Sequence, residues 1–280
     1  MFDNIRVMVD ALTSDPINFL IILLYTIVVI LTSLILHEYA HGRVALACGD
    51  PTAKLLGRLS LNPLRHLDPL GTVCMFVAGF GWAKPVPVNP ANYRKGRRDD
   101  FFVAIAGIVT NLTLFFICIV AAVLLNQLIW TEEFMQDATR VMGSQEFLLN
   151  PYYDRVLVSG DANYLSASVI YSEGHNLIGP FTDMMRMPWL IWIQRFLLMM
   201  SQVNLALAVF NFLPIPPLDG FHLLNDTLLK GKLQLNQRMF QIAYFILLAL
   251  CFTGILDKLL SFLNSNVYSA VVRFLLMIFG

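Results

Sequence analysis

Charged side chains are scarce in this sequence. Asp, Glu, Lys and Arg make up 14% of its 280 residues, whereas a typical soluble domain has roughly a quarter. The 19 basic and 19 acidic residues cancel, and 57% of the residues are hydrophobic. The low charge argues against a soluble protein, and the zero net charge argues against nucleic acid as a partner. We therefore predict an α-helical polytopic membrane protein that is embedded in the lipid bilayer.

Cysteine is scarce as well. The four cysteines lie far apart and form no C-x-x-C pair, which excludes a disulfide framework and a thiolate zinc site. A cleavable signal peptide is also not indicated, because the first apolar run is too long for the core of one. These features leave the apolar runs as the main guide to the architecture.

Long apolar runs alternate with polar stretches along the whole chain. We expect three core spans, then a fourth span, while the length of 264–280 does not decide whether that tail crosses the membrane. The expected spans are 17–48, 101–129, 188–213 and 239–263. The chain then divides into an interfacial segment, the first core spans, an extracytoplasmic loop and the C-terminal spans, at residues 1–16, 17–129, 130–187 and 188–280.

The stretch between the first two spans is apolar but too short to cross a bilayer as a helix. Residues 70–82 number only thirteen and contain three glycines, and the proline-rich residues 83–90 follow them. We expect a re-entrant or interfacial piece here, followed by an extended strand or loop.

Basic residues concentrate in two short stretches. Residues 43–100 and 230–238 hold twelve of the 19 Lys and Arg residues, while 131–187 has a net charge of −5. Because short loops rich in Lys and Arg remain cytoplasmic, we expect these two stretches to face the cytoplasm and the acidic loop to face outward.

The first apolar run ends in the motif His37-Glu38-Tyr39-Ala40-His41. On a helix the two histidines share one face and can bind one metal ion, while Glu38 lies beside them without being a ligand. Two His ligands with a neighbouring Glu are typical of zinc hydrolases. The alternative is a chance pattern on an exposed helix face, but such a face would be costly in hydrocarbon. We therefore predict one Zn²⁺ per chain.

A zinc hydrolase site needs a third protein ligand. The best candidate is Asp219 in the segment Pro214-Ile215-Pro216-Pro217-Leu218-Asp219-Gly220, at the cytoplasmic end of the third span. The prolines break the helix there, and a carboxylate at that position can reach the depth of the two histidines. Taken alone, the segment could equally be a loop at a membrane exit.

At this point the chain resembles the site-2 protease family of intramembrane zinc metalloproteases, in its short prokaryotic branch without a PDZ domain. The resemblance covers most of 31–115 and 200–226. It rests on the following segments: His37-Glu38-Tyr39-Ala40-His41-Gly42, Gly49–Lys54, Gly57–Pro63, His66–Gly71, Gly79–Val88, and Asn211-x-x-Pro214-x-Pro216-Pro217-Leu218-Asp219-Gly220.

The resemblance implies a core of three spans around zinc bound by His37, His41 and Asp219, with Glu38 as the catalytic base. It also implies that residues 51–69 and 79–90 form membrane-associated β-hairpin or re-entrant elements, which offer an edge to an unfolded substrate. The family's Ala-Gly-Pro-x-x-Asn element reads Ala106-Gly107-Ile108-Val109-Thr110-Asn111 here, with Ile108 in place of Pro. Asn111 is then a candidate catalytic donor to an oxyanion or to the substrate backbone. An interhelical polar contact is the open alternative.

The function implied is peptide-bond hydrolysis within or near transmembrane segments of single-span membrane proteins, in regulated intramembrane proteolysis. We expect a multi-pass protein of a prokaryotic plasma membrane with its active site toward the cytoplasmic leaflet. The alternative is a metal-transporting or metal-sensing membrane protein without hydrolytic activity. A transporter typically has internal repeats, and we see none. The oligomeric state is left open. We interpret His66, His175 and His222 as structural.

Overall fold

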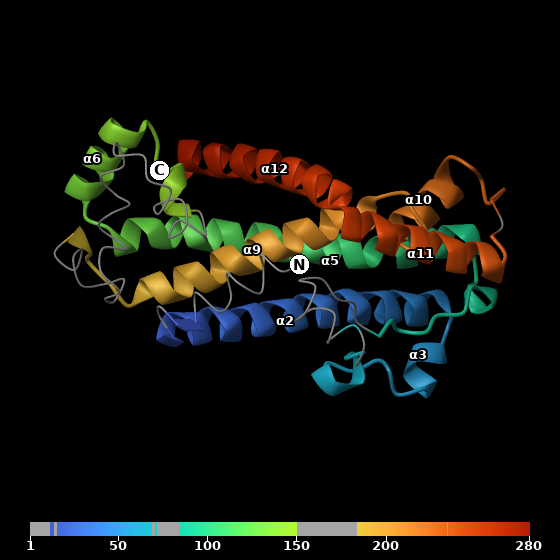
Figure 1. Cartoon of the computed structure of the whole chain (residues 1–280). Coiled ribbons are helices and arrows are strands. Elements are labelled where there is room, and N and C mark those ends of the chain that lie inside the picture. Colours follow the sequence, from blue (N-terminus) through green and yellow to red (C-terminus); the bar gives the residue numbers. More distant parts are fainter. Residues whose placement is uncertain (1–11, 14–15, 69–70, 72–83, 150–183, 234) are drawn as a thin grey trace. The chain divides into compact units, whose positions relative to one another are not determined.

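The computed structural model describes residues 12–13, 16–68, 71, 84–149, 184–233 and 235–280. These residues are mainly helical (Figure 1). The α-helices are α2 (Pro16–Cys48), α3 (Thr52–Leu55), α5 (Arg97–Ile129), α6 (Glu132–Met142), α9 (Leu190–Phe212), α10 (Asp219–Thr227), α11 (Gln237–Thr253) and α12 (Ile255–Phe279). The short 3-10 helices are η1 (Pro63–Arg65), η2 (Pro90–Asn92) and η3 (Glu146–Leu149).

Four of these helices are long and apolar enough to cross a membrane: Phe19–Cys48, Arg97–Ile129, Leu190–Phe212 and Lys258–Phe279. They confirm a multi-pass membrane protein. The first three correspond to the predicted core spans. The second begins a turn earlier than predicted, because Asp99 and Asp100 occupy its first turn, where carboxylates are stabilised by the free backbone N–H groups.

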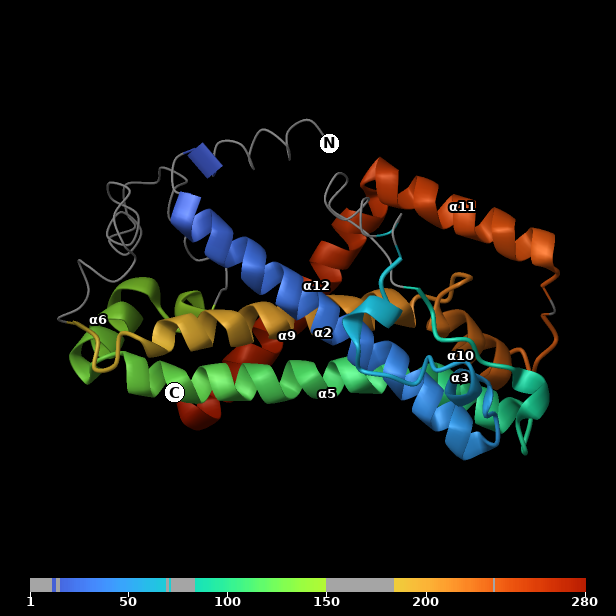
Figure 2. The same cartoon turned by 90° about the horizontal axis from the view of Figure 1, so that it is seen from below.

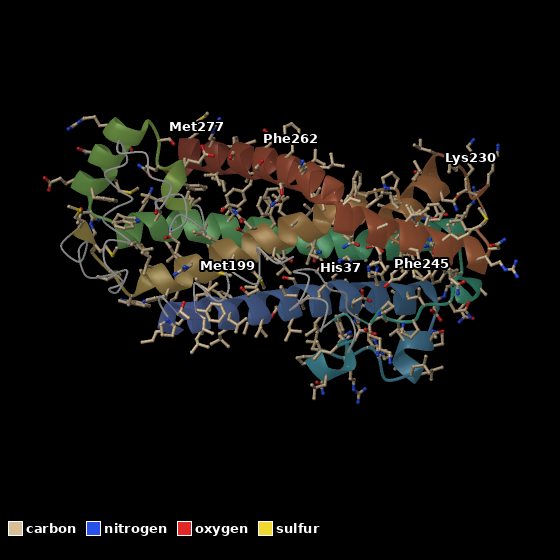
Figure 3. All side chains as sticks on the ribbon, viewed as in Figure 1. His37, Met199, Lys230, Phe245, Phe262 and Met277 are labelled. Atoms are coloured by element: carbon tan, nitrogen blue, oxygen red, sulfur yellow. The ribbon has the colours of Figure 1, made fainter. Side chains whose placement is uncertain are left out.

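The C-terminal spans differ from the prediction. Instead of one span at 239–263, the chain divides at Gly254, which has a φ of +71°. Such a left-handed residue ends α11, and α12 then begins at Ile255. The apolar part of α11, Arg238–Leu250, is short, whereas α12 can span. Both helices carry large apolar side chains on their exposed faces, including Phe245, Phe262 and Met277 (Figure 3).

The predicted re-entrant piece at 70–82 and part of the β element at 79–90 fall on residues 69–70 and 72–83, which lie outside the described residues. Around them the described chain forms the short helical turns α3, η1 and η2. One isolated bridge, between Trp130 and Met185, is found elsewhere. The described part of the chain contains no β-strand, and the β element stays a prediction.

The chain packs as two units. Unit 1 comprises the described residues of 30–114 and 203–265, and unit 2 those of 7–29, 115–202 and 266–280. The helices α2, α5, α9 and α12 each contribute residues to both units. The units do not test the division into four consecutive segments, which stays a prediction.

In unit 1, the C-terminal part of α2, the N-terminal part of α5 and the C-terminal part of α9 pack together (Figures 1 and 2). Ala104 and Ile108 of α5 contact Ala208 of α9. A hydrogen bond of 2.8 Å from Asn204 Nδ2 to Ser33 Oγ joins α9 to α2. Small residues at such positions let apolar helices approach closely, and buried polar pairs hold them in register.

The short helical turns α3 and η1 follow α2 and lie beside its C-terminal half (Figures 1 and 2). Gly49, with a φ of +111°, ends α2, and the buried Asp50 follows it. The Asp50 carboxylate accepts hydrogen bonds from Asn89 N–H at 2.7 Å and from Asn92 Nδ2 at 2.7 Å. These bonds fasten the residues just before α5 to the end of α2.

In unit 2, neutral polar side chains form several of the hydrogen bonds between helices. Gln194 of α9 donates to the Ala122 carbonyl at 3.0 Å and to Asn126 Oδ1 at 3.1 Å, both on α5. The Tyr25 hydroxyl of α2 donates to the Trp192 carbonyl at 3.3 Å. Each donor thus meets an acceptor, which is required of buried polar groups between apolar helices.

Candidate metal centre

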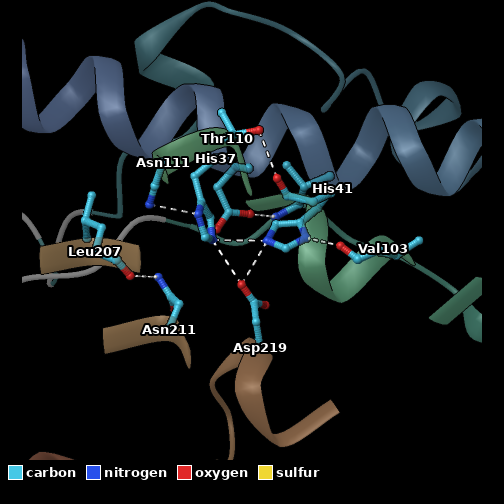
Figure 4. A network of polar contacts seen from close by, with 11 residues as sticks. His37, His41, Val103, Thr110, Asn111, Leu207, Asn211 and Asp219 are labelled. Atoms are coloured by element: carbon cyan, nitrogen blue, oxygen red, sulfur yellow. Dashed lines mark hydrogen bonds and ion pairs between the residues drawn. The ribbon is translucent and has the colours of Figure 1, made fainter. Parts of the chain in front are cut away.

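The two histidines of the sequence motif point from one face of α2 at a common place (Figure 4). Both are buried in unit 1, with 5% and 9% of their surface exposed. Their Nε2 atoms are 3.0 Å apart. Because His37 and His41 are four residues apart on a helix, the spacing brings the two rings together without distorting the backbone.

Asp219 approaches the same place from the start of α10. Its Oδ2 lies 3.3 Å from Nε2 of His37 and 3.3 Å from Nε2 of His41. Gly220 makes this approach possible, because a Cβ there would lie within 2.5 Å of the Leu213 carbonyl oxygen and closer still to that of Phe212. The first turn of α10 can therefore pack directly against the last turn of α9, and this fixes the carboxylate of Asp219.

The spacing of these three atoms fits a zinc ion. Ligand atoms at the corners of a tetrahedron with metal bonds of about 2.0 Å lie about 3.3 Å from one another. The separations here are 3.0, 3.3 and 3.3 Å. Two imidazole nitrogens and one carboxylate oxygen are also a donor set that suits zinc. His37, His41 and Asp219 could therefore hold the metal.

Gly107 of α5 leaves space beside these atoms. A Cβ at this position would lie 2.6 Å from Nε2 of His37 and closer still to Nε2 of His41. It would thus collide with the two imidazole nitrogens that lie beside Asp219. Sequence reasoning gave Gly107 no role, although a glycine inside a long helix is costly and suggests a close approach.

The other ring nitrogens are held by α5. Nδ1 of His41 lies 2.7 Å from the Val103 carbonyl, which can accept its proton. This contact leaves Nε2 with a lone pair for a metal. Nothing in the sequence marks a backbone carbonyl as a partner, so this contact could not be predicted.

Asn111 holds the second imidazole. Its buried amide nitrogen lies 3.2 Å from Nδ1 of His37, and its Oδ1 has no partner among the described residues. Oxygen and nitrogen of an amide are exchanged by a half-turn. With the oxygen toward His37, Asn111 would accept the Nδ1 proton, both groups would be satisfied, and Nε2 would be free for a metal. The structure thus places Asn111 against a histidine; its catalytic role stays a prediction.

The electrostatics keep Asp219 ionised. Burial alone would raise the pKa of its carboxyl group, but hydrogen bonds from the two imidazoles, and the positive charge of their protonated form, lower that pKa below its ordinary value. An ionised carboxylate between two imidazoles is what a divalent cation needs for binding.

Glu38 lies one residue after His37 and does not join the three atoms. One of its oxygens, Oε2, accepts a hydrogen bond of 2.7 Å from the backbone N–H of Val86. This donor comes from the segment that precedes α5, 48 residues away in the sequence. No motif predicts it, because the bond is made by the backbone.

The other described histidines make separate contacts. His66 is buried, with Nε2 2.6 Å from the Ser60 carbonyl. His222 lies on α10 with Nδ1 3.4 Å from Asp100 Oδ2. His175 lies outside the described residues.

Comparison with known proteins agrees with this geometry. The family described as peptidase family M50 matches residues 25–254, a range that includes all the residues above. The chain is 33% identical over 207 residues to the Bacillus subtilis (strain 168) protein named "Putative zinc metalloprotease YwhC", covering 74% of this chain and 70% of that protein. No solved structure matches. The resemblance to the site-2 protease family is thereby confirmed, and the chain belongs to peptidase family M50.

Proposed function

We propose that this metalloprotease of the membrane hydrolyses peptide bonds within or next to the transmembrane segments of single-span membrane proteins, in regulated intramembrane proteolysis. In this proposal His37, His41 and Asp219 hold one Zn²⁺ and Glu38 is the general base. The observation that carries it is the convergence of two imidazole nitrogens and a carboxylate oxygen, 3.0 to 3.3 Å apart, between helices apolar enough to span a membrane.

The residues divide the chemistry among them. When bound, Zn²⁺ supplies a Lewis acid that makes water acidic and polarises a peptide carbonyl. Glu38 takes the proton of the attacking water at its free oxygen and then gives it to the departing amine. The Val103 carbonyl and Asn111 keep the Nδ1 atoms of the two histidines occupied, so that Nε2 of each ring is presented to the metal.

The proposed site faces the cytoplasmic leaflet of a prokaryotic plasma membrane. The motif lies near the C-terminal end of α2, a helix of 33 residues that is about 50 Å long, against about 30 Å for the hydrocarbon core. The basic residues follow this end of the helix closely. Water therefore has a short path to Glu38 from that side.

The test compares wild type with Glu38→Gln, purified in detergent. We expect zinc in both, chelator-sensitive cleavage of single-span test substrates by the wild type, and a loss of about 10²–10⁴-fold in kcat for the variant. Glu132→Gln, which changes an exposed carboxylate of α6, is the matched control and should cleave normally.

Three other results would contradict the proposal. Normal turnover by Glu38→Gln would show that another group is the base. Zinc in the wild type without cleavage of any substrate would favour a metal transporter or sensor. Zinc missing from the wild type would remove the metal site.

A further inference from the structure

The carboxylate of Glu38 is held by a short extended segment, Lys84–Pro87, which we call the strap. The Val86 N–H donates to Glu38 Oε2 at 2.7 Å, and Val86 itself is buried, with 6% of its surface exposed. A hydrogen bond of this length to a carboxylate is of the strong, charge-assisted kind. It engages one oxygen of Glu38 and leaves Oε1 for other partners.

The strap lies across one face of α2. Glu38 and Gly42 are four residues apart and share that face. A Cβ at Gly42 would lie 3.1 Å from Cγ1 of Val86, so the glycine makes room for the Val86 side chain. Val86 is therefore held at two points, with its side chain beside Gly42 and its N–H at Glu38.

Two prolines leave the strap with little else to donate. Pro85 and Pro87 have no N–H, so Val86 carries the one amide proton between Lys84 and Val88. The Lys84 N–H is already bonded to the His66 carbonyl at 2.7 Å. An edge that receives a substrate strand needs free N–H groups at alternate residues. Residues 84–87 do not offer them, which points to a different role for this segment.

The strap is also anchored from outside. Nη2 of Arg58 donates to the carbonyls of Lys84 at 2.8 Å and Pro85 at 3.2 Å. Beyond the strap, Asn89 N–H is bound by the Asp50 carboxylate. The strap is thus fixed on both sides of Val86, and its conformation does not depend on the bond to Glu38.

We propose that the strap is a positioning element, in which the Val86 N–H fixes the orientation of the Glu38 carboxylate for proton transfer. This inference rests on the proposed function, since it assigns a partner to the proposed base. With Oε2 anchored, Glu38 presents Oε1 in one orientation. Misplacement of a catalytic group by about 1 Å can cost about 100-fold in rate, so an anchored carboxylate has a large advantage.

The same contact allows an opposite reading, in which the strap blocks Glu38 and must leave before catalysis. The two interpretations predict opposite changes in kcat when the Val86 N–H is removed. Loss of the N–H lowers kcat if the strap positions Glu38, and raises it if the strap inhibits.

The test is Val86→Pro in the full chain, which removes the donor and keeps an extended backbone, as expected before Pro87. We expect kcat to fall by about 10- to 100-fold, the size of a lost hydrogen bond to a charged group. KM and zinc content should stay within about twofold of wild type, because neither the ligands nor the substrate contacts change. Val86→Ala keeps the donor and should lose less activity than Val86→Pro.

Val88→Pro is the matched control. It introduces the same residue two positions on, where the side chain is exposed and the N–H makes no hydrogen bond among the described residues. It should cleave as the wild type does. If Val86→Pro loses zinc, replacement of Val86 by its α-hydroxy acid, which exchanges N–H for an ester oxygen without adding a ring, decides the question.

The outcomes distinguish failure of the positioning role from failure of the proposed protease function. A lower kcat with zinc retained, in Val86→Pro or in the ester, supports the positioning role. An unchanged or higher kcat overturns it and leaves the protease assignment intact. Failure of the wild type to cleave any substrate counts against the proposed function, and with it against the strap's role.

Discussion

Each unit buries a cluster of polar side chains between apolar helices, and the two clusters differ in the kinds of atoms that meet. In unit 2 the Gln194 amide donates to Ala122 and Asn126, so each donor meets an acceptor. In unit 1 two imidazole nitrogens and a carboxylate oxygen face one another. When the imidazoles are neutral and their protons lie on Nδ1, all three atoms bear lone pairs and none can donate.

Buried polar side chains can thus serve two purposes inside a membrane protein. Where donors and acceptors are matched, all hydrogen bonds are made and the cluster links the helices. Three acceptor atoms placed together have no donor among them and need a cation between them. The same three side chains are therefore unfavourable without a metal ion and stabilising when one is bound. The test of this comparison is to alter each kind separately.

The largest effect should come from filling the space beside the acceptors. Gly107→Ala would place a methyl group within 2.6 Å of Nε2 of His37, where the ion is expected. We predict that zinc falls below about one-tenth of the wild-type content and that cleavage is lost with it, since crowding of a packed interior is not relieved easily. Metal analysis of the purified protein measures this. Val109→Ala, an exposed position on the same helix, should keep its zinc.

A smaller effect should come from the group that orients His37. Asn111→Leu removes the amide beside Nδ1, and we expect zinc affinity to fall by about 10- to 100-fold, as for other outer partners of metal ligands. Gln194→Leu in unit 2 should instead leave zinc affinity unchanged and lower the free energy of unfolding by about 1–3 kcal/mol, because it leaves polar groups unpaired. Equal loss of zinc in both variants would erase the distinction between the two clusters.

The smallest effect concerns Asp226 of α10, which lies outside the spanning helices. Burial, and then the charge of Asp100, raise its pKa to about 6. The ionised carboxylate is thus less stable in the folded protein, so stability declines as the pH rises from the ordinary carboxyl pKa toward 6. Asp226→Asn should raise the free energy of unfolding by roughly 1 kcal/mol above pH 6, after allowance for solvent screening, and by little near about pH 4. Unfolding measured at both pH values decides; an equal gain at both would point to another cause.

Much of the architecture is readable in the sequence because hydrocarbon imposes simple rules. Long apolar runs with few charged residues predicted the three core spans. The spacing of His37 and His41 predicted that their rings would meet. The pattern around Asp219 was less informative, because a carboxylate after several prolines could belong to an ordinary loop. The family resemblance was needed to prefer Asp219 as a ligand over that alternative. The structure brings the three together; their role as zinc ligands is a proposal.

The remaining features could not be predicted from the sequence, because they depend on backbone conformation or on packing. Gly254 lies inside an apolar stretch, and its left-handed conformation moves the final span from 239–263 to α12. Gly107 has meaning only once α5 lies against the two histidines. The Val86 N–H joins residues 48 positions apart, and a peptide group has no signature in the sequence.

A peptide donor at Glu38 also changes how position 86 can vary. Every amino acid except proline supplies the same N–H, so substitutions there spare the contact and alter only the fit beside Gly42. We therefore expect the size of the side chain at position 86 to decide which substitutions are tolerated, while the hydrogen bond to Glu38 stays the same. If Glu38 is the base, as we propose, this part of the site tolerates most substitutions at position 86.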